Sequence, residues 1–268
     1  SFFGQAISSP IMAAPMVNSK MNAGGALSEK EMAEAITVGT HLAGSLTWLG
    51  APLSNSYEWY EAMEGVGRGV VIGKPLTDQD RIIETFRSAE KRGAVAVGID
   101  VDGAGLVTMK LLGYPVGPKT ISQLQELAQS TRLPFVVKGV MTAADAVKCA
   151  EAGVSTIVVS NHGGRVLDHT CGTAEALPTI ANKVKGRMTI LVDGGIRSGT
   201  DVLKMLALGA DGVLVGRPLI VGAYGGGAEG VKLLLEKYMA ELYAAMILTG
   251  CASIKDIDSR ILASRFCR

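Results

Sequence analysis

Eight short apolar runs, rich in valine and isoleucine, recur along the whole chain. Each run is continuous rather than alternating with polar residues, which is typical of parallel strands buried on both faces. The sequence therefore predicts eight parallel strands, over residues 10–16, 45–50, 69–75, 94–101, 133–140, 156–163, 189–196 and 212–218.

Amphipathic segments separate these runs, and several open with Ser or Thr and close at Gly, as capped helices do. They include residues 28–43, 77–93, 142–153 and 199–210. The predicted strands start about 29 residues apart on average, which is the size of one βαβ unit. Eight such units predict an α/β fold, a closed (β/α)8 TIM barrel with a parallel eight-stranded sheet. A doubly wound open sheet is the alternative.

We expect residues 1–268 to form a single domain, since no linker or low-complexity segment divides them. Residues 102–118 are predicted to be the longest irregular loop, and residues 223–230 the loop after the eighth strand. The chain lacks an initiator Met and a signal-peptide pattern, so we expect it to begin inside a longer protein.

Charge and composition favour a small-molecule partner. With 26 Lys and Arg against 25 Asp and Glu, the net charge of +1 favours neither nucleic acid nor an anionic membrane. Polar residues interrupt every apolar run before the roughly 18 residues that a membrane span needs, so no membrane insertion is expected. The cysteines at 149, 171, 251 and 267 form no C-x-x-C pair, which indicates neither a metal site nor a disulfide framework and favours a cytoplasmic location.

The ends of the seventh and eighth strands predict a phosphate cradle. Glycine lets backbone N–H groups approach phosphate oxygens, a helix N-terminus adds its dipole, and arginine can grip two oxygens. The residues in question are Asp193, Gly194, Gly195, Arg197, Gly216 and Arg217. Ordinary tight turns with surface arginines are the alternative.

The fifth and sixth strands end in groups suited to chemistry. Lys138 follows the buried run PFVV and is expected to meet an anion, either a reduced flavin ring or a barrel carboxylate. In Ser160-Asn-His-Gly-Gly-Arg, His162 can move a proton while Arg165 holds a carboxylate. This pairing suits a 2-hydroxy acid.

Two aspartates after the fourth strand are candidate partners of the histidine. Asp100 and Asp102 point to the same side of an extended chain, so either can orient His162, and the other can bind Lys138 or Lys74. Lys74, at the end of the third strand, can reach cofactor, substrate or only water. The remaining histidines, His41 and His169, are interpreted as structural, since neither has metal-ligand spacing.

These motifs resemble the FMN-dependent 2-hydroxy acid oxidase and dehydrogenase family, which includes glycolate oxidase, lactate oxidase, flavocytochrome b2 and mandelate dehydrogenase. From about residue 133 onward, PFVVKGVMTAADA, IVVSNHGGRVLD, ILVDGGIRSGTDVLKMLALGAD and VLVGRP follow the family's barrel motifs in order. Nearer the start, MAAPM resembles the family's first-strand segment beside the flavin, and this part of the match is looser.

The resemblance implies FMN as cofactor and a role for each motif. His162 would be the active-site base, Asp102 its partner, Arg165 the substrate carboxylate ligand and Lys138 a flavin contact. The other implied cofactor-binding residues are Ala14, Pro15, Met16, Ser45, Thr47, Lys74, Asp100, Ser160, Asp193, Gly194, Gly195, Arg197, Gly216 and Arg217. A homo-oligomer is also implied.

The sequence departs from the family where substrate is held. Val71, Gly73 and Lys74 replace a third-strand glutamine and tyrosine, and GAGLVTMKLLGYPVG replaces an arginine-containing run after the fourth strand. From the same comparison we expect the N-terminal segment with a further tyrosine to be absent and the loop over the active site to be shorter, so that the pocket is either more open or closed by another subunit.

The main hypothesis is oxidation of a small 2-hydroxy acid to the 2-oxo acid, with His162 as base and flavin N5 as hydride acceptor. A related FMN barrel acting as an isomerase or another alcohol dehydrogenase is the second reading. A non-catalytic flavin binder is the third, and a flavin-free enzyme acting on a phosphate ester is the last.

Overall fold

The computed structural model describes residues 1–17, 19–51 and 60–263, and within them eight strands form one parallel sheet. Consecutive strands are neighbours from β2 to β8, and β8 pairs with β1. The strands are β1 (Ile11–Ala13), β2 (Trp48–Gly50), β3 (Gly69–Gly73), β4 (Ala94–Asp100), β5 (Phe135–Val140), β6 (Thr156–Val159), β7 (Thr189–Val192) and β8 (Gly212–Val215).

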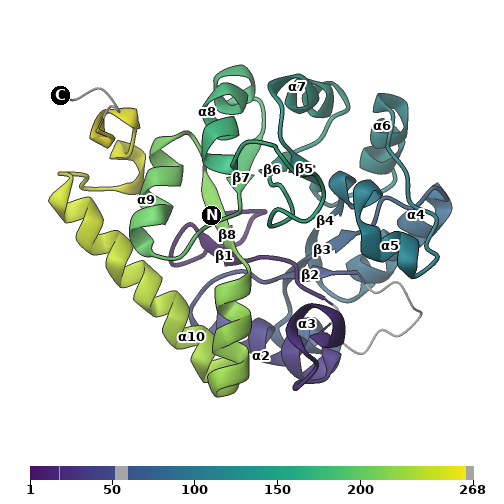
Figure 1. The fold of residues 1–268 in the computed structure, drawn as a ribbon, viewed down its shortest axis with the longest axis horizontal. Helices are drawn as coiled ribbons and strands as arrows, with labels where there is room; N and C mark the ends of the chain where they lie inside the picture. The colour runs from purple at the N-terminus through teal and green to yellow at the C-terminus, as the bar shows by residue number, and fades with distance from the viewer. Residues whose placement is uncertain (18, 52–59, 264–268) are drawn as a thin grey trace.

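Two contacts bring β1 and β2 together and nearly close the sheet into a barrel. The backbone N–H of Ala13 donates to the carbonyl of Leu46 at 3.3 Å, and Met16 forms a parallel bridge with Leu49. The helices surround this ring of strands (Figure 1). The predicted (β/α)8 barrel is therefore confirmed, and the open-sheet alternative is wrong.

Helices alternate with the strands and most begin at a side-chain cap. Ser28 and Thr120 form capping boxes, and Thr142 and Ser198 each accept a hydrogen bond from a first-turn N–H. The α-helices are α1 (Ser19–Ala23), α2 (Glu29–Leu42), α3 (Tyr60–Val66), α4 (Gln79–Lys91), α5 (Val107–Leu111), α6 (Ile121–Gln129), α7 (Ala143–Glu151), α8 (Thr173–Val184), α9 (Gly199–Ala207) and α10 (Arg217–Leu248). Three 3-10 turns are η1 (Val101–Gly105), η2 (Ile254–Asp256) and η3 (Ser259–Ile261).

The core has two layers, because successive strand residues point to opposite faces. Inward-facing side chains such as Met12, Trp48 and Val136 fill the barrel, and outward-facing side chains pack against the helices. Phe2 and Phe3 of the N-terminal segment pack against the inner layer, and the Phe3 ring lies 5.9 Å from the Trp48 ring. Aromatic residues therefore fill one end of the barrel, which leaves the other end for a ligand.

The structure corrects two predicted loops. Residues 102–118 include most of η1, which begins at Val101, and all of α5, so this connection is not wholly irregular. Residues 223–230 lie within α10, with a break only at Gly226 and Gly227, whose backbone angles are non-helical. The Gly-rich composition predicted a loop, but the two glycines instead form a kink between the two helical halves of α10.

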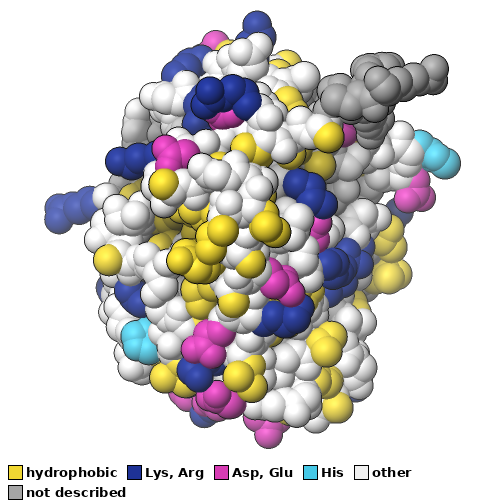
Figure 2. All heavy atoms as spheres, turned by 90° about the vertical axis from the view of Figure 1, so that its left-hand side faces the viewer, with side chains coloured by type: hydrophobic (Ala, Val, Ile, Leu, Met, Phe, Trp, Pro, Cys, Tyr) yellow, Lys and Arg dark blue, Asp and Glu magenta, His cyan; other side chains and the backbone are white. Residues whose placement is uncertain are grey.

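The face that carries α10 gathers hydrophobic side chains (Figure 2). Along α10 the large exposed hydrophobic residues are Val221, Leu233, Tyr243, Ile247 and Leu248. Among the described helices, none is both long and apolar enough to cross a membrane.

Candidate active site

A cavity of about 310 Å³ opens at the carboxyl ends of the strands, the end where (β/α)8 barrels hold their ligands. Its volume lies at the lower end of the range of about 300–1,000 Å³ for small-molecule sites. Fourteen predicted site residues line it: Ala14, Pro15, Met16, Lys74, Asp100, Lys138, His162, Arg165, Asp193, Gly194, Gly195, Arg197, Gly216 and Arg217. Segments far apart in the sequence thus converge on one site.

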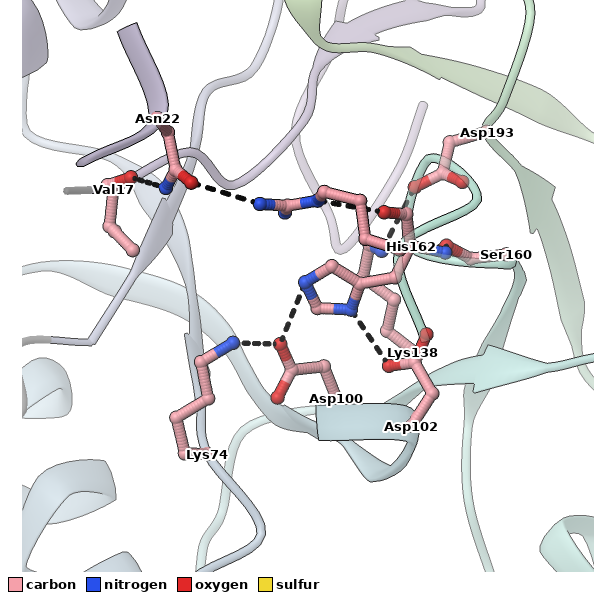
Figure 3. Close-up of polar contacts among 10 residues, drawn as sticks. Val17, Asn22, Lys74, Asp100, Asp102, Lys138, Ser160, His162 and Asp193 are labelled. Atoms are coloured by element: carbon pink, nitrogen blue, oxygen red, sulfur yellow. Dashed lines mark hydrogen bonds and ion pairs between the residues drawn. The ribbon is translucent and has the colours of Figure 1, made fainter. Parts of the chain in front are cut away.

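His162 occupies the loop after β6 in the left-handed backbone region, with φ of 56°. A residue other than glycine rarely adopts this conformation, which costs free energy and is retained where the structure requires it. Its N–H donates to Ser160 Oγ at 3.2 Å, and its ring lies 3.0 Å from Asp102, from Nδ1 to Oδ1 (Figure 3). An Nδ1 proton donated to Asp102 leaves Nε2 of the neutral imidazole free to accept a proton.

Asp102 is held in place by an irregularity in the neighbouring strand. The β5–β6 register shifts between Lys138 and Val140, and Gly139 between them has φ of 97°. A Cβ at Gly139 would lie 2.5 Å from the Asp102 carboxyl carbon, so only glycine leaves room for this carboxylate. Burial opposes ionisation of Asp102, but the hydrogen bond and charge of His162, with Lys138 and Lys74, lower its pKa below the ordinary value.

Lys138 is buried at the end of β5 between two polar partners. Its Nζ lies 2.7 Å from Ser160 Oγ and 3.0 Å from Asp193 Oδ2. Burial disfavours the ammonium ion, yet the charges of Asp193, Asp102 and Asp100 outweigh it and raise the Lys138 pKa. Of the two anions expected for Lys138, a barrel carboxylate is the one in contact here, and the cation still lines the cavity.

Asp100 and Lys74 form a second ion pair on the other side of the histidine (Figure 3). Asp100 Oδ2 is the bonded atom, and it lies 4.0 Å from His162 Nε2. The sequence left open which aspartate orients His162 and which binds a lysine. In the structure Asp102 orients His162, and Asp100 binds Lys74.

Arg165 reaches over the cavity from the same loop as His162. Its Nε donates to the His162 carbonyl at 3.1 Å, and Nη1 donates to Asn22 Oδ1 at 3.0 Å. Asn22, in α1, in turn donates to the carbonyl of Val17 at 2.6 Å. These contacts fix the guanidinium plane while its remaining N–H groups can bind a carboxylate. Burial and the neighbouring charge of Arg217 lower the Arg165 pKa, as expected for cations gathered to meet an anion.

The predicted phosphate cradle is formed by the loops after β7 and β8. Gly194 and Gly195 have φ of 93° and 74°, a conformation that lets successive N–H groups point the same way. Gly216 precedes the first residue of α10, so the N-terminus of that helix lies at the cavity. Arg197 and Arg217 line the same cavity, so two guanidinium groups and a helix N-terminus lie together there, as the predicted phosphate cradle requires.

Three predicted cofactor contacts do not line the cavity. Ser45 and Thr47 precede β2, on the side of the strand away from its carboxyl end, and Ser45 Oγ donates to the carbonyl of Ile11. Ser160 is fully buried beneath the loop, where it accepts hydrogen bonds from Lys138 and His162. The prediction assumed that hydroxyl side chains near a strand end face the ligand, which these three do not. Ser160 instead supports the residues that do.

Other contributors to the site were missed by sequence reasoning. Asn22 positions Arg165, and Thr173 Oγ1 donates to the Asp193 carbonyl at 2.7 Å. Leu106 and Met109, around α5, give the cavity an apolar wall. No motif marks these residues, because each is brought to the site by a different connection of the barrel.

The charges of the site fit a bound phosphate ester. Five cations, Lys74, Lys138, Arg165, Arg197 and Arg217, gather around three carboxylates, Asp100, Asp102 and Asp193, which leaves an excess of two positive charges. Within the described chain, no carboxylate forms an ion pair with any of the three arginines. A phosphate monoester carries about −1.5 to −2 charge at neutral pH and would offset this excess.

Fold and site together define a (β/α)8 barrel whose cation-rich cavity holds a carboxylate-oriented histidine beside an arginine. The family model described as FMN-dependent dehydrogenase matches residues 113–264, more than half of the chain. The chain belongs to this FMN-dependent family, and its residues fit FMN, with the cradle for the phosphate and Lys138 facing the same cavity.

Relatives extend the match beyond that region. L-lactate oxidase of Nostoc sp. is 31% identical over 303 positions, which cover 98% of this chain and 81% of that enzyme. Peroxisomal (S)-2-hydroxyacid oxidase GLO3 of Arabidopsis thaliana is 48% identical over 50% of this chain and 37% of its own length. A mandelate oxidase variant with a monooxide FMN adduct superposes with a TM-score of 0.79 at 34% identity, covering 95% of this chain and 79% of that one.

The chain spans only part of the length of several of these relatives. The alignments with GLO3, GLO4 and a Dictyostelium discoideum oxidase span 37% of each relative, so the chain matches little more than a third of those enzymes. The lactate oxidase alignment runs over 303 positions against 268 residues here, so at least 35 positions of that relative have no counterpart.

Proposed function

We propose that the chain is an FMN-dependent oxidoreductase that oxidises a small 2-hydroxy acid to the 2-oxo acid, within a single FMN-binding barrel domain. The observation that carries the proposal is the His162–Asp102 pair beside Arg165 in one cavity. Its relatives are named as oxidases or dehydrogenases of such acids.

The residues divide the reaction between them. Arg165 binds the substrate carboxylate through N–H groups that Asn22 and the His162 carbonyl leave free. This grip places the 2-hydroxyl near Nε2 of His162, which takes its proton, and Asp102 stabilises the imidazolium that forms. FMN held in this cavity would supply the hydride acceptor for the substrate carbon, at flavin N5. Lys138 contributes positive charge on the cofactor side of the cavity.

Binding of FMN is tested first. Purified protein should carry a flavin absorption band or recover one when incubated with FMN. A colourless protein that cannot be reconstituted contradicts the proposal and favours a flavin-free enzyme acting on a phosphate ester.

Turnover is tested by anaerobic mixing with glycolate, lactate and mandelate, which should bleach the flavin band. His162→Ala should retain FMN and lose bleaching, whereas His41→Ala, an exposed histidine on α2, should bleach like the unmodified protein. Bleaching by none of these acids contradicts the proposed substrate class. It favours an isomerase, another alcohol dehydrogenase or a non-catalytic flavin binder.

Assembly and location are part of the same proposal. We expect copies of the chain to associate, supported by the exposed apolar residues of α10, and sedimentation velocity would reveal a monomer if this is wrong. A cytoplasmic location is also proposed, although the relatives include peroxisomal enzymes, and fractionation of the source cells tests it.

A further inference from the structure

His162 lies between two carboxylates, and one of them is already paired with a lysine. Asp102 contacts Nδ1, and Asp100 Oδ2 lies 4.0 Å from Nε2. The Lys74–Asp100 pair is nearly buried, with side chains 10% and 7% exposed, and Asp100 Oδ1 has no hydrogen-bond partner within the described residues. The aspartate therefore depends on Lys74 for compensation of its charge.

This arrangement bears on whether the ring can act as a base. Two uncompensated carboxylates beside one imidazole favour its protonated form, and a protonated Nε2 cannot accept a proton from substrate. A cation in contact with one carboxylate offsets most of this effect, because its field opposes that of the carboxylate at the ring.

The other charged groups around His162 do not replace Lys74. From β5, Lys138 contacts Asp193 and Ser160. From the loop of His162 itself, Arg165 contacts the His162 carbonyl and Asn22, and from α10, Arg217 lies near Gly163. Of the cations in the described chain, Lys74 alone is within ion-pair distance of Asp100, apart from the histidine.

We propose that Lys74 is a positioning residue that neutralises Asp100 and so keeps His162 Nε2 available as the base, an inference that rests on the proposed function. The Lys74–Asp100 pair thus tunes proton uptake at Nε2 from the side opposite Asp102.

The test measures protonation of His162 directly, in FMN-loaded protein labelled at its histidine rings. The chain has three histidines, so His41→Ala and His169→Ala assign the NMR signals. Lys74→Met should move the His162 titration midpoint upward; for scale, a unit charge 4.0 Å from Nε2, the distance of Asp100 Oδ2, changes the midpoint by about 0.8 pH unit in a water-like medium. Asp100→Asn should move it downward.

Two further variants make the outcome specific. Lys74→Arg should keep the His162 midpoint of the unmodified protein. The double variant Lys74→Met with Asp100→Asn should bring the midpoint back toward that value, since both charges are then absent. The acid limb of the kcat/KM profile for lactate should follow the same order, with activity of Lys74→Met recovering at higher pH.

An unchanged midpoint in Lys74→Met, with the fold and FMN retained, would overturn the inference. So would a double variant that shifts as far as Lys74→Met, because the effect would then not pass through Asp100. The titration does not depend on turnover. A shifted midpoint therefore supports the role of Lys74 even if none of the acids bleaches the flavin. Absence of bleaching counts only against the proposed substrate class.

Discussion

Asp102→Asn removes one charge from the site while leaving the shape of the side chain. The amide oxygen can still accept a hydrogen bond from Nδ1 of His162. In the unmodified protein this Nδ1 lies 3.0 Å from Asp102 Oδ1. Two unit charges 3.0 Å apart interact by about 5.5 kcal/mol at an effective dielectric constant of 20, which is the upper limit of the interaction lost. A hydrogen bond to a charged group contributes about 1.5–3 kcal/mol. Each 1.36 kcal/mol changes a rate tenfold, so we expect flavin reduction to slow roughly 10- to 150-fold.

The rate of anaerobic flavin bleaching by lactate, measured by stopped flow, tests this expectation. The FMN content and thermal melting of the variant must match those of the unmodified protein for the comparison to hold. Asp145→Asn is the matched control, since it removes an exposed carboxylate that is paired with Lys148 and does not line the cavity. A rate for Asp102→Asn within threefold of the control would refute the role of Asp102 in stabilising protonated His162.

Three other predictions follow from the same geometry. Gly139→Ala should displace Asp102, because its Cβ would lie 2.5 Å from that carboxyl carbon, and should slow bleaching with little loss of FMN. Arg217→Met should weaken FMN binding about tenfold or more in a fluorescence titration, by losing a charge-assisted contact of about 1.5–3 kcal/mol, whereas exposed Arg187→Met should not. Because the pKa of Asp102 is lower in the folded state than in the unfolded chain, its stabilising contribution is complete above about pH 5 and is lost as the pH falls through the folded pKa. The difference in free energy of unfolding between Asp102→Asn and the unmodified protein should therefore narrow from pH 6 to pH 3 in urea melts.

The barrel was predictable because its signal is local and repeated. Every one of the eight apolar runs contains a strand, although most strands end earlier than the run. The polar residues that close the runs leave the sheet to form the site: His162 was assigned to a strand that ends at Val159, and Asp193 to one that ends at Val192. The Gly-rich stretch within α10 misled because composition alone does not distinguish a loop from a kinked helix.

The sequence by itself determined the barrel and the placement of glycines, arginines and His162 after the strands, since each depends on residue types within one strand and loop. The tertiary structure decided which aspartate meets which cation, that Asn22 holds Arg165, and that Ser45 and Thr47 lie away from the cavity. These pairings join side chains from different connections. They depend on the stagger and bulges of neighbouring strands, such as the shift at Gly139, which no local pattern encodes.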